Sequence, residues 1–353
     1  MLKNSTFLAL SILFFSHCAQ EKVDVRVVCE ATPPGYYKIK WETFPPMEGI
    51  VKIYESSIPD SFNVYSPIAE SEISKGFADI FPAQTTKRSY FKLVFNKTYS
   101  VVTAERTIPM EGLFNFRDLG GYYNVNGKQT RWGKLYRSSS LARATSQDVK
   151  VLKNLDIQTV LDFRTERERY EATSKFVAPQ TINFPLRGNP QNIFFDRILS
   201  KEMRAGDIKI YAQDMLAFLL ENNSDYFVKM FDILSDASNY PILVHCSLGS
   251  DRSAIACALV LAALDIDKDQ IISDFMLTNG QIDYNSVLPM ENIFLQDQDV
   301  QETFTAQYRV HKGTITYSFD KIAKEYGTLD NYFNNELELT TKKREKLKEI
   351  MLY

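Results

Sequence analysis

The sequence predicts an α/β protein in which a central, largely parallel sheet flanked by helices follows a small all-β, sandwich-like domain. Two patterns support this division of the 353 residues. Residues 22–108 contain short strand-like runs between turn-rich segments and show no long helical period. Residues 109–353 alternate strand-like and helical segments, which is the pattern of a sheet wrapped by helices. A chain of this length accommodates two domains.

The composition is that of an ordinary globular protein, with 44% hydrophobic and 24% charged residues. The net charge of −3 gives no reason to expect a nucleic-acid partner. Four cysteines are too few for a disulfide framework. The three histidines, His17, His245 and His311, are scattered along the chain, so we predict no metal site and no cofactor.

Residues 1–18 have the features of an export signal. Lys3 is their only charge, and the apolar run 7–15 is too short to span a membrane. The segment ends at Cys18 and resembles a bacterial lipoprotein signal, in which the cysteine is lipidated. Because His17 stands where that pattern has a small residue, a plain secretory signal cleaved near Ala19 is the alternative. We expect an exported protein, either anchored to the membrane by lipid or free in the periplasm or outside the cell.

The first domain shows the alternation of half-buried strands. Tyr37, Ile39 and Trp41 alternate with charged residues, and further strand-like runs occupy 50–54, 90–95 and 99–103. Proline-rich turns separate them. Short strands at this spacing predict a β-sandwich, which is similar to the fibronectin-type modules found before bacterial catalytic domains. Spacing or docking is its expected role.

The second domain opens with residues 115–122, NFRDLGGY. The double glycine indicates a tight turn, and we expect Arg117 and Asp118 to form an ion pair. Residues 134–138 read as a strand, and Thr145 as the N-cap of a helix with Asp148 three residues later. Residues 160–164 predict the next strand, and the apolar residues of 215–234 predict a helical region.

A short apolar run at 242–244 predicts a buried strand in a parallel sheet. From Ser253 onward the chain is apolar on all sides, which predicts a buried helix. The loop between them begins at Cys246 and ends at Arg252. Ligands of such sheets bind at the carboxyl ends of the strands, which is where this loop is expected.

The residues of this loop predict a phosphate site that contains a nucleophile. A helix N-terminus directs backbone N–H groups at an anion, and Gly249 permits a positive φ angle. Arg252 can bind two phosphate oxygens at once. Cys246 lies in the same positive field, which favours the nucleophilic thiolate. The predicted phosphate-binding residues are Ser247, Leu248, Gly249, Ser250, Asp251 and Arg252.

Five segments, in this order, resemble the motifs of bacterial tyrosine-protein and dual-specificity phosphatases: NFRDLGGY, YRS at 136–138, D-F-R-x-x-x-E at 162–168, H-C-x5-R-S at 245–253, and YGT at 326–328. Rhodanese-like domains also place a cysteine in an anion-binding loop, but Gly249 and Ser253 favour the phosphatase. The resemblance implies a cysteine-phosphatase fold in residues 109–353. Cys246 is then the nucleophile of a phosphocysteine mechanism, and Arg252 stabilises the transferring phosphoryl oxygens.

The resemblance also suggests roles for neighbouring residues. Asp251, directly before the arginine, is the first candidate for the general acid. Ser253 is expected to donate a hydrogen bond to the sulfur, and His245 to orient the loop through hydrogen bonds. Three acidic residues before the loop strand are alternative acids, and four charged residues are expected to buttress the loop through ion pairs. The alternative acids are Asp196, Asp207 and Asp214, and the buttressing residues are Arg117, Asp118, Asp162 and Arg164.

One position departs from the family pattern, because Ser250 stands where a lysine is usual. A lost positive charge weakens binding of polyanionic phosphoinositides more than binding of phosphotyrosine. We therefore expect an exported protein-tyrosine phosphatase, with dual specificity within its range, whose substrates are phosphotyrosine proteins or other phosphomonoesters. The alternatives are a phosphoinositide phosphatase and an inactive phosphate-binding surface protein. Membrane contact is expected only through the lipid on Cys18.

Overall fold

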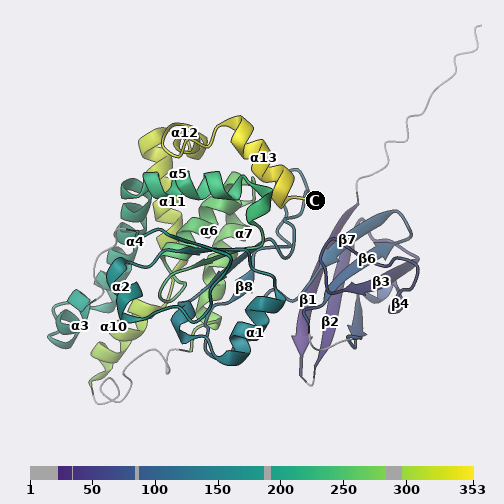
Figure 1. Ribbon diagram of the computed structural model, residues 1–353, viewed down its shortest axis with the longest axis horizontal. Coiled ribbons are helices and arrows are strands. Elements are labelled where there is room, and N and C mark those ends of the chain that lie inside the picture. The colour runs from purple at the N-terminus through teal and green to yellow at the C-terminus, as the bar shows by residue number, and fades with distance from the viewer. Residues whose placement is uncertain (1–22, 34, 84–86, 187–191, 284–295) are drawn as a thin grey trace, which may run out of the picture.

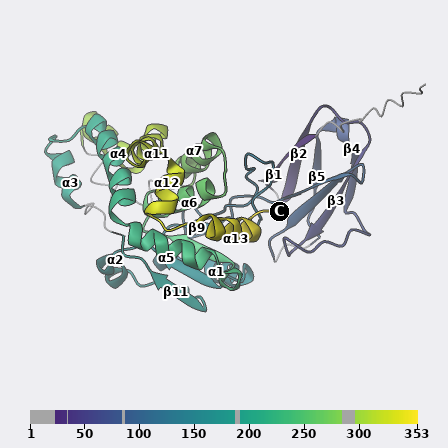
Figure 2. The same ribbon diagram turned by 90° about the horizontal axis from the view of Figure 1, so that it is seen from above.

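The computed structural model describes residues 23–353 except 34, 84–86, 187–191 and 284–295. They form an all-β unit and a larger α/β unit that lie side by side (Figures 1 and 2). The predicted fold class is confirmed, since the β unit comes first and the α/β unit contains a largely parallel sheet. The expected signal, residues 1–18 with Cys18, lies outside the described residues.

Two antiparallel sheets make the first unit, with strand orders β1-β2-β5 and β4-β3-β6-β7. Every second side chain turns inward, so Ile39, Trp41 and Phe91 join one apolar core between the sheets. A short 3-10 turn, Ile73–Lys75, precedes β5, and its first carbonyl accepts the Trp41 indole N–H at 2.8 Å. The strands are β1 (Asp24–Thr32), β2 (Tyr36–Phe44), β3 (Ile50–Ser56), β4 (Ala69–Glu72), β5 (Phe77–Ile80), β6 (Tyr90–Phe95) and β7 (Tyr99–Thr103).

A five-stranded sheet of order β11-β10-β12-β9-β8 forms the centre of the second unit. Four strands are parallel, and the edge strand β8 runs antiparallel to β9. Because β12 lies in the middle, its carboxyl end is surrounded by the ends of β10 and β9. The strands are β8 (Arg117–Asp118), β9 (Leu135–Ser138), β10 (Thr159–Asp162), β11 (Gln180–Asn183) and β12 (Ile242–His245).

Helices cover both faces of this sheet. Ile242 and Val244 of β12 pack into the large core that contains α6, whereas Leu243 packs with Leu152 of α1 on the other face. The helices are α1 (Ser146–Asn154), α2 (Glu166–Glu171), α3 (Asn192–Leu199), α4 (Ala205–Asn222), α5 (Ser224–Leu234), α6 (Arg252–Ala263), α7 (Lys268–Leu277), α10 (Gln298–Tyr308), α11 (Lys312–Tyr326), α12 (Leu329–Asn335) and α13 (Thr341–Met351), with 3-10 turns at Leu141–Arg143, Ala237–Asn239 and Thr278–Gly280.

Local sequence signals explain where several elements begin. Thr145 and Asp148 form the expected capping box at the start of α1. The helical region expected at 215–234 is two helices, α4 and α5, which are separated at Asn223. From Ser253 to Ala263 every residue of α6 is buried, in agreement with its apolar sequence.

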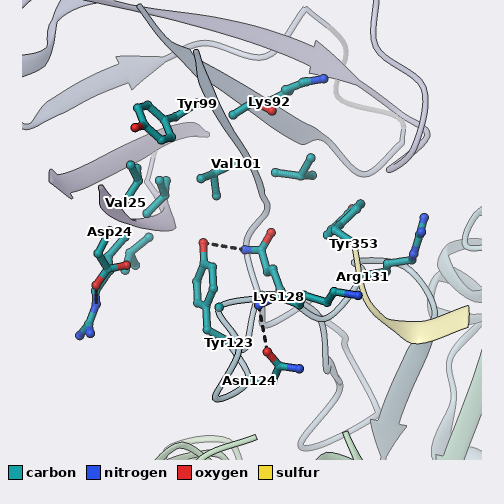
Figure 3. Close-up of a pocket in the computed structure, with 18 of the residues that line it drawn as sticks. Asp24, Val25, Lys92, Tyr99, Val101, Tyr123, Asn124, Lys128, Arg131 and Tyr353 are labelled. Carbon is teal, nitrogen blue, oxygen red and sulfur yellow. Dashed lines mark hydrogen bonds and ion pairs between the residues drawn. The ribbon is translucent and has the colours of Figure 1, made fainter. Parts of the chain in front are cut away.

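The two units enclose a groove of about 1340 Å³ along part of their boundary (Figure 3). Strands β1 and β7 border it on one side, and residues of the segment 121–131 with the C-terminal Tyr353 border it on the other. Elsewhere the units are in direct contact: the Trp132 indole donates to the Val102 carbonyl at 2.9 Å. In the described part of the chain, no helix is long and apolar enough to cross a membrane.

Candidate active site

The loop between β12 and α6 begins with Cys246, which is buried, with 2% of its surface exposed. Gly249 has a φ angle of +75°, and a Cβ there would lie 2.7 Å from the Ser138 carbonyl oxygen. Only glycine therefore fits this turn, which the sequence predicted. The turn directs backbone toward the sulfur: the Gly249 N–H lies 3.3 Å from Sγ of Cys246. The Ser253 hydroxyl lies 3.4 Å from the same sulfur, on the first turn of α6.

Arg252 begins α6 and is held by the carboxylate of Glu168, whose role the sequence pattern did not predict. Its Nη1 and Nη2 donate to the two oxygens of Glu168 at 2.6 and 2.7 Å. Nη1 also donates to the Phe163 carbonyl at 3.2 Å. This paired geometry fixes the plane of the guanidinium. Burial acts to raise the pKa of Glu168, but the hydrogen bonds and charge of Arg252 outweigh it and lower the pKa to about 2.

Glu168 is positioned by the start of α2. It is the third residue after the N-cap Thr165, and the two form a capping box. Its carboxylate also accepts a hydrogen bond from the Ser247 hydroxyl. The D-F-R-x-x-x-E segment of the sequence contains this glutamate, which lies in the first turn of α2, shortly after the end of β10.

Two side chains hold the loop in place through hydrogen bonds to the Gly249 carbonyl. It accepts from Nη2 of Arg137 at 2.6 Å and from Nδ2 of Asn115 at 2.7 Å. Arg137 and Arg117 stand opposite each other in β9 and β8, and Asp274 of α7 lies between them. Arg137 Nη1 reaches Asp274 at 2.8 Å and Arg117 Nε reaches it at 2.9 Å. The shared carboxylate offsets the repulsion between two facing cations.

The expected ion pair between Arg117 and Asp118 is wrong. Successive side chains of a strand point to opposite faces, so Arg117 turns toward Asp274 and Asp118 turns toward the β-sandwich. There Asp118 pairs with Arg88. Burial acts to raise the pKa of Asp274, yet the charges of Arg117 and Arg137 hold that pKa well below its usual range.

Asp162 and Arg164 form the ion pair that the sequence predicted, at 2.8 Å, with side chains 4% and 3% exposed. Arg164 also donates to the Ser140 hydroxyl at 3.1 Å and to the Ala172 carbonyl at 2.6 Å. This pair links the end of β10 to the segments that follow β9 and α2. Like Glu168, it supports the rim of the loop and does not reach the sulfur through any described hydrogen bond.

His245 differs from its expected role of orienting the loop through hydrogen bonds. Its ring is fully buried, and neither ring nitrogen has a hydrogen-bond partner among the described residues. Oδ2 of Asp162 lies 3.6 Å from Nε2. Burial lowers the pKa of His245 to about 4. The imidazole is therefore neutral near pH 7 and acts as a packed ring under the loop.

Asp251 ends the loop just before Arg252. Its Oδ2 accepts from the Ser250 hydroxyl at 3.1 Å, and burial raises the pKa of Asp251. A raised pKa keeps a carboxylic acid protonated at higher pH, as proton donation requires. Asp251 and Ser250 also line a recess of about 60 Å³, together with Tyr211, Met215, Phe275 and Tyr308. The alternative acids Asp196, Asp207 and Asp214 all lie on exposed positions of α3 and α4.

The two other cysteines of the described residues have the environment of structural thiols. Cys257 lies inside α6, and burial raises its pKa to about 12. Cys29 is buried in β1, and burial raises its pKa also. Among the described residues, no group of three or more His, Cys, Asp or Glu side chains is placed to hold a metal ion.

Residues 108–353 match the model of the tyrosine phosphatase family. The "putative tyrosine-protein phosphatase" of Cupriavidus necator is 26% identical over 246 residues, which are 67% of this chain and 86% of that protein. The triple specificity protein phosphatase PtpB of Mycobacterium tuberculosis is 27% identical over 203 residues, 51% of this chain and 71% of that protein. The core catalytic domain of the PP-IP phosphatase SIW14 from S. cerevisiae aligns with a TM-score of 0.29 and 16% identity, covering 64% of this chain and 96% of that one.

Proposed function

The chain belongs to the tyrosine phosphatase family, and from that premise we propose that it is an exported enzyme that hydrolyses phosphotyrosine through a phosphocysteine intermediate. The observation that carries the mechanism is the loop itself. Cys246 and Arg252 lie at its two ends, at the carboxyl end of a central parallel strand, with a backbone N–H 3.3 Å from the sulfur. Protein-tyrosine phosphatase activity is the function of the family; the covalent step and export are our proposals.

In the first step the Cys246 thiolate attacks phosphorus. An S–P bond forms, the P–O bond to the tyrosine breaks, and Asp251 transfers its proton to the departing phenolate oxygen. The loop N–H groups and Arg252 stabilise the equatorial oxygens of the transferring phosphoryl group. The bidentate contact with Glu168 supports this role, because it holds the guanidinium plane before substrate arrives.

In the second step water attacks the phosphocysteine. A P–O bond forms, the S–P bond breaks, and the Asp251 carboxylate takes the proton released by the water. The sulfur leaves as a thiolate that the Ser253 hydroxyl, 3.4 Å away, stabilises with a hydrogen bond. The products are inorganic phosphate and the starting form of the enzyme.

The test of the mechanism is hydrolysis of p-nitrophenyl phosphate and of a phosphotyrosine peptide in the presence of EDTA. Cys246→Ser is expected to lower kcat by more than about 1000-fold. The matched control is Cys257→Ser, which changes a second buried thiol, inside α6, and is expected to leave turnover in place. Asp251→Asn is expected to lower the peptide rate roughly 100-fold and the nitrophenyl rate less, because nitrophenolate leaves without a proton. Wild-type turnover that survives in Cys246→Ser refutes the mechanism.

Phosphotyrosine is favoured over phosphoinositides by Ser250. Ser250 is 5% exposed, and its hydroxyl donates a hydrogen bond to Asp251. This position therefore adds no positive charge to the pocket. The comparison of kcat/KM for a phosphotyrosine peptide and a phosphoinositide is expected to favour the peptide. Ser250→Lys is expected to shift the ratio toward the lipid. A clear lipid preference of the wild-type enzyme contradicts the assignment.

Export rests on the sequence of residues 1–18 alone. In a bacterial host, the full chain is expected to partition into detergent with a lipid on Cys18, and Cys18→Ala is expected to remove the lipid. A soluble, cleaved product from both chains assigns the plain secretory signal instead. An uncleaved product in the cytoplasm contradicts export.

A further inference from the structure

The short ribbon of β8 and β9 connects the catalytic loop to the β-sandwich. Arg117 faces Arg137 across it, and Asp118 faces Tyr136. Alternate residues of a strand lie on opposite faces. One face of the ribbon therefore carries the arginine that holds the Gly249 carbonyl at 2.6 Å. The other face presents Asp118 and Tyr136 to the sandwich.

On that second face, Arg88 of the sandwich reaches across the boundary. It donates to the Asp118 carboxylate and, at 2.8 Å, to the Glu105 carbonyl. Its guanidinium lies 4.7 Å from the ring centre of Tyr90 and 5.8 Å from that of Tyr136. The side chain of Arg88 is 10% exposed and that of Asp118 is 0% exposed. A carboxylate this deeply buried is costly unless a cation accompanies it, and Arg88 is its ion-pair partner within the described chain.

On the side of the sandwich, the surroundings of Asp118 are closely packed. Gly133 has a φ of +73°, and its N–H donates to Asp118 at 2.8 Å. A Cβ on this glycine would lie 2.9 Å from Pro59 and 3.1 Å from the Tyr90 hydroxyl, both of the sandwich. The groove of Figure 3, farther along the boundary, is open by contrast. There Asp60 is 3.7 Å from Arg131 and 3.6 Å from Lys134.

We propose that Arg88 of the β-sandwich is a positioning residue for the phosphatase reaction. By neutralising Asp118 it fixes β8 against β9, and the opposite face of the same ribbon holds the Gly249 carbonyl through Arg137. Gly249 in turn supplies the N–H that points at the nucleophilic sulfur. Through Arg88, the sandwich thus helps to hold the catalytic loop of the same chain in position. This inference rests on the proposed cysteine mechanism.

The experiment compares four full-length chains: wild type, Arg88→Met, Asp60→Asn and the double variant Arg88→Met with Asp118→Asn. Asp60→Asn is the matched control, because it removes the other ion pairs across the same boundary without touching β8. Each chain is assayed for kcat and KM on p-nitrophenyl phosphate at a temperature where circular dichroism shows it folded. Orthovanadate affinity, measured separately by calorimetry, reports the loop geometry without turnover.

Arg88→Met is expected to lower kcat roughly tenfold to a hundredfold with KM unchanged, and to weaken orthovanadate binding. Asp60→Asn is expected to match wild type. The double variant is expected to recover part of the loss, because the buried charge is gone. Equal kcat in wild type and Arg88→Met overturns the inference, as does an equal loss in Asp60→Asn. If Arg88→Met does not fold, Arg88→Lys is measured against the same criteria.

Failure of the proposed function gives a different result. Wild-type turnover that does not depend on Cys246 refutes the cysteine mechanism, whatever Arg88 does. The orthovanadate comparison still decides whether Arg88 positions the loop. Unchanged orthovanadate affinity in folded Arg88→Met, beside wild-type turnover that does depend on Cys246, overturns the positioning role alone.

Discussion

The outer surface of the β-sandwich and the surroundings of the catalytic loop use charge in opposite ways. On the sandwich, ion pairs such as Lys52 with Glu70 join side chains that are 37% and 49% exposed. Around the loop, Arg117, Arg137 and Asp274 are 0–4% exposed. Exposed pairs contribute little to stability, whereas buried ones are costly unless their geometry is complete. Through Arg137 the buried pairs hold the Gly249 carbonyl, so the cost of burying these charges goes with the placement of the catalytic loop.

The largest expected effect comes from removing the shared carboxylate. Asp274→Ala leaves Arg117 and Arg137 buried, facing each other and without an anion. The free energy of unfolding is expected to fall by about 3–5 kcal/mol, as measured by urea denaturation. Asp320→Ala, which breaks the exposed pair with Lys268 at 2.7 Å, is the control. Similar losses in the two variants would remove the contrast between buried and exposed pairs.

Acid is expected to destabilise the protein through His245. Its pKa is about 4 in the folded chain and 6.5 when unperturbed. Between these values the unfolded chain binds the proton and the folded chain does not, so stability is full above pH 6.5 and falls as pH drops toward 4. Relative to His245→Gln, wild type is expected to lose up to about 3 kcal/mol over this range. Urea titrations at several pH values measure it, and a pH-independent difference contradicts the buried neutral ring.

Glu168→Gln tests the rim of the loop. The amide cannot hold Arg252 with two charged hydrogen bonds, so the guanidinium loses its fixed plane. We expect kcat to fall roughly tenfold or more with little change in KM, in steady-state assays of p-nitrophenyl phosphate. Glu171→Gln, on the same helix, loses only the exposed pair with Arg167 at 2.7 Å and is expected to match wild type. An unaltered kcat in Glu168→Gln would show that Arg252 does not need this carboxylate.

The smallest effect is expected on the sandwich surface. Glu70→Gln removes the 2.8 Å contact with Lys52. The free energy of unfolding is expected to change by less than about 0.5 kcal/mol, again by urea denaturation. A loss of several kcal/mol would show that this exposed pair contributes as much to stability as the buried pairs around the loop.

The catalytic loop could be predicted from sequence because its parts are adjacent. The strand, Gly249 and the two reactive residues fall within a few positions of one another, and the turn geometry allows only glycine. Chain proximity also made the pair of Asp162 and Arg164 predictable. The strand 242–244 and the buried helix after it follow from the same local, continuous apolar pattern.

The supporting network could not be predicted in the same way. Arg117 and Asp274 are 157 positions apart, and Asn115 and Gly249 are 134 apart. The first contact depends on how α7 packs against the sheet and the second on where the catalytic loop lies beside residue 115, and no local pattern carries that information. The neighbouring charges of Arg117 and Asp118 suggested a pair, but β8 is extended and sends them to opposite faces. Arg88 lay in a different domain from its partner, where sequence gave no reason to look for one.

The most direct test of the mechanism is to trap its intermediate. Asp251→Asn enzyme is mixed with p-nitrophenyl phosphate, quenched in acid within the first turnover, digested and analysed by mass spectrometry. Nitrophenolate leaves without a proton, so loss of Asp251 is expected to slow the hydrolysis step more than the first step, and phosphate accumulates on the peptide that contains Cys246. The phosphocysteine mechanism predicts one phosphate on that thiol and none in Cys246→Ser. Phosphate on another residue, or the same label in Cys246→Ser, would contradict it.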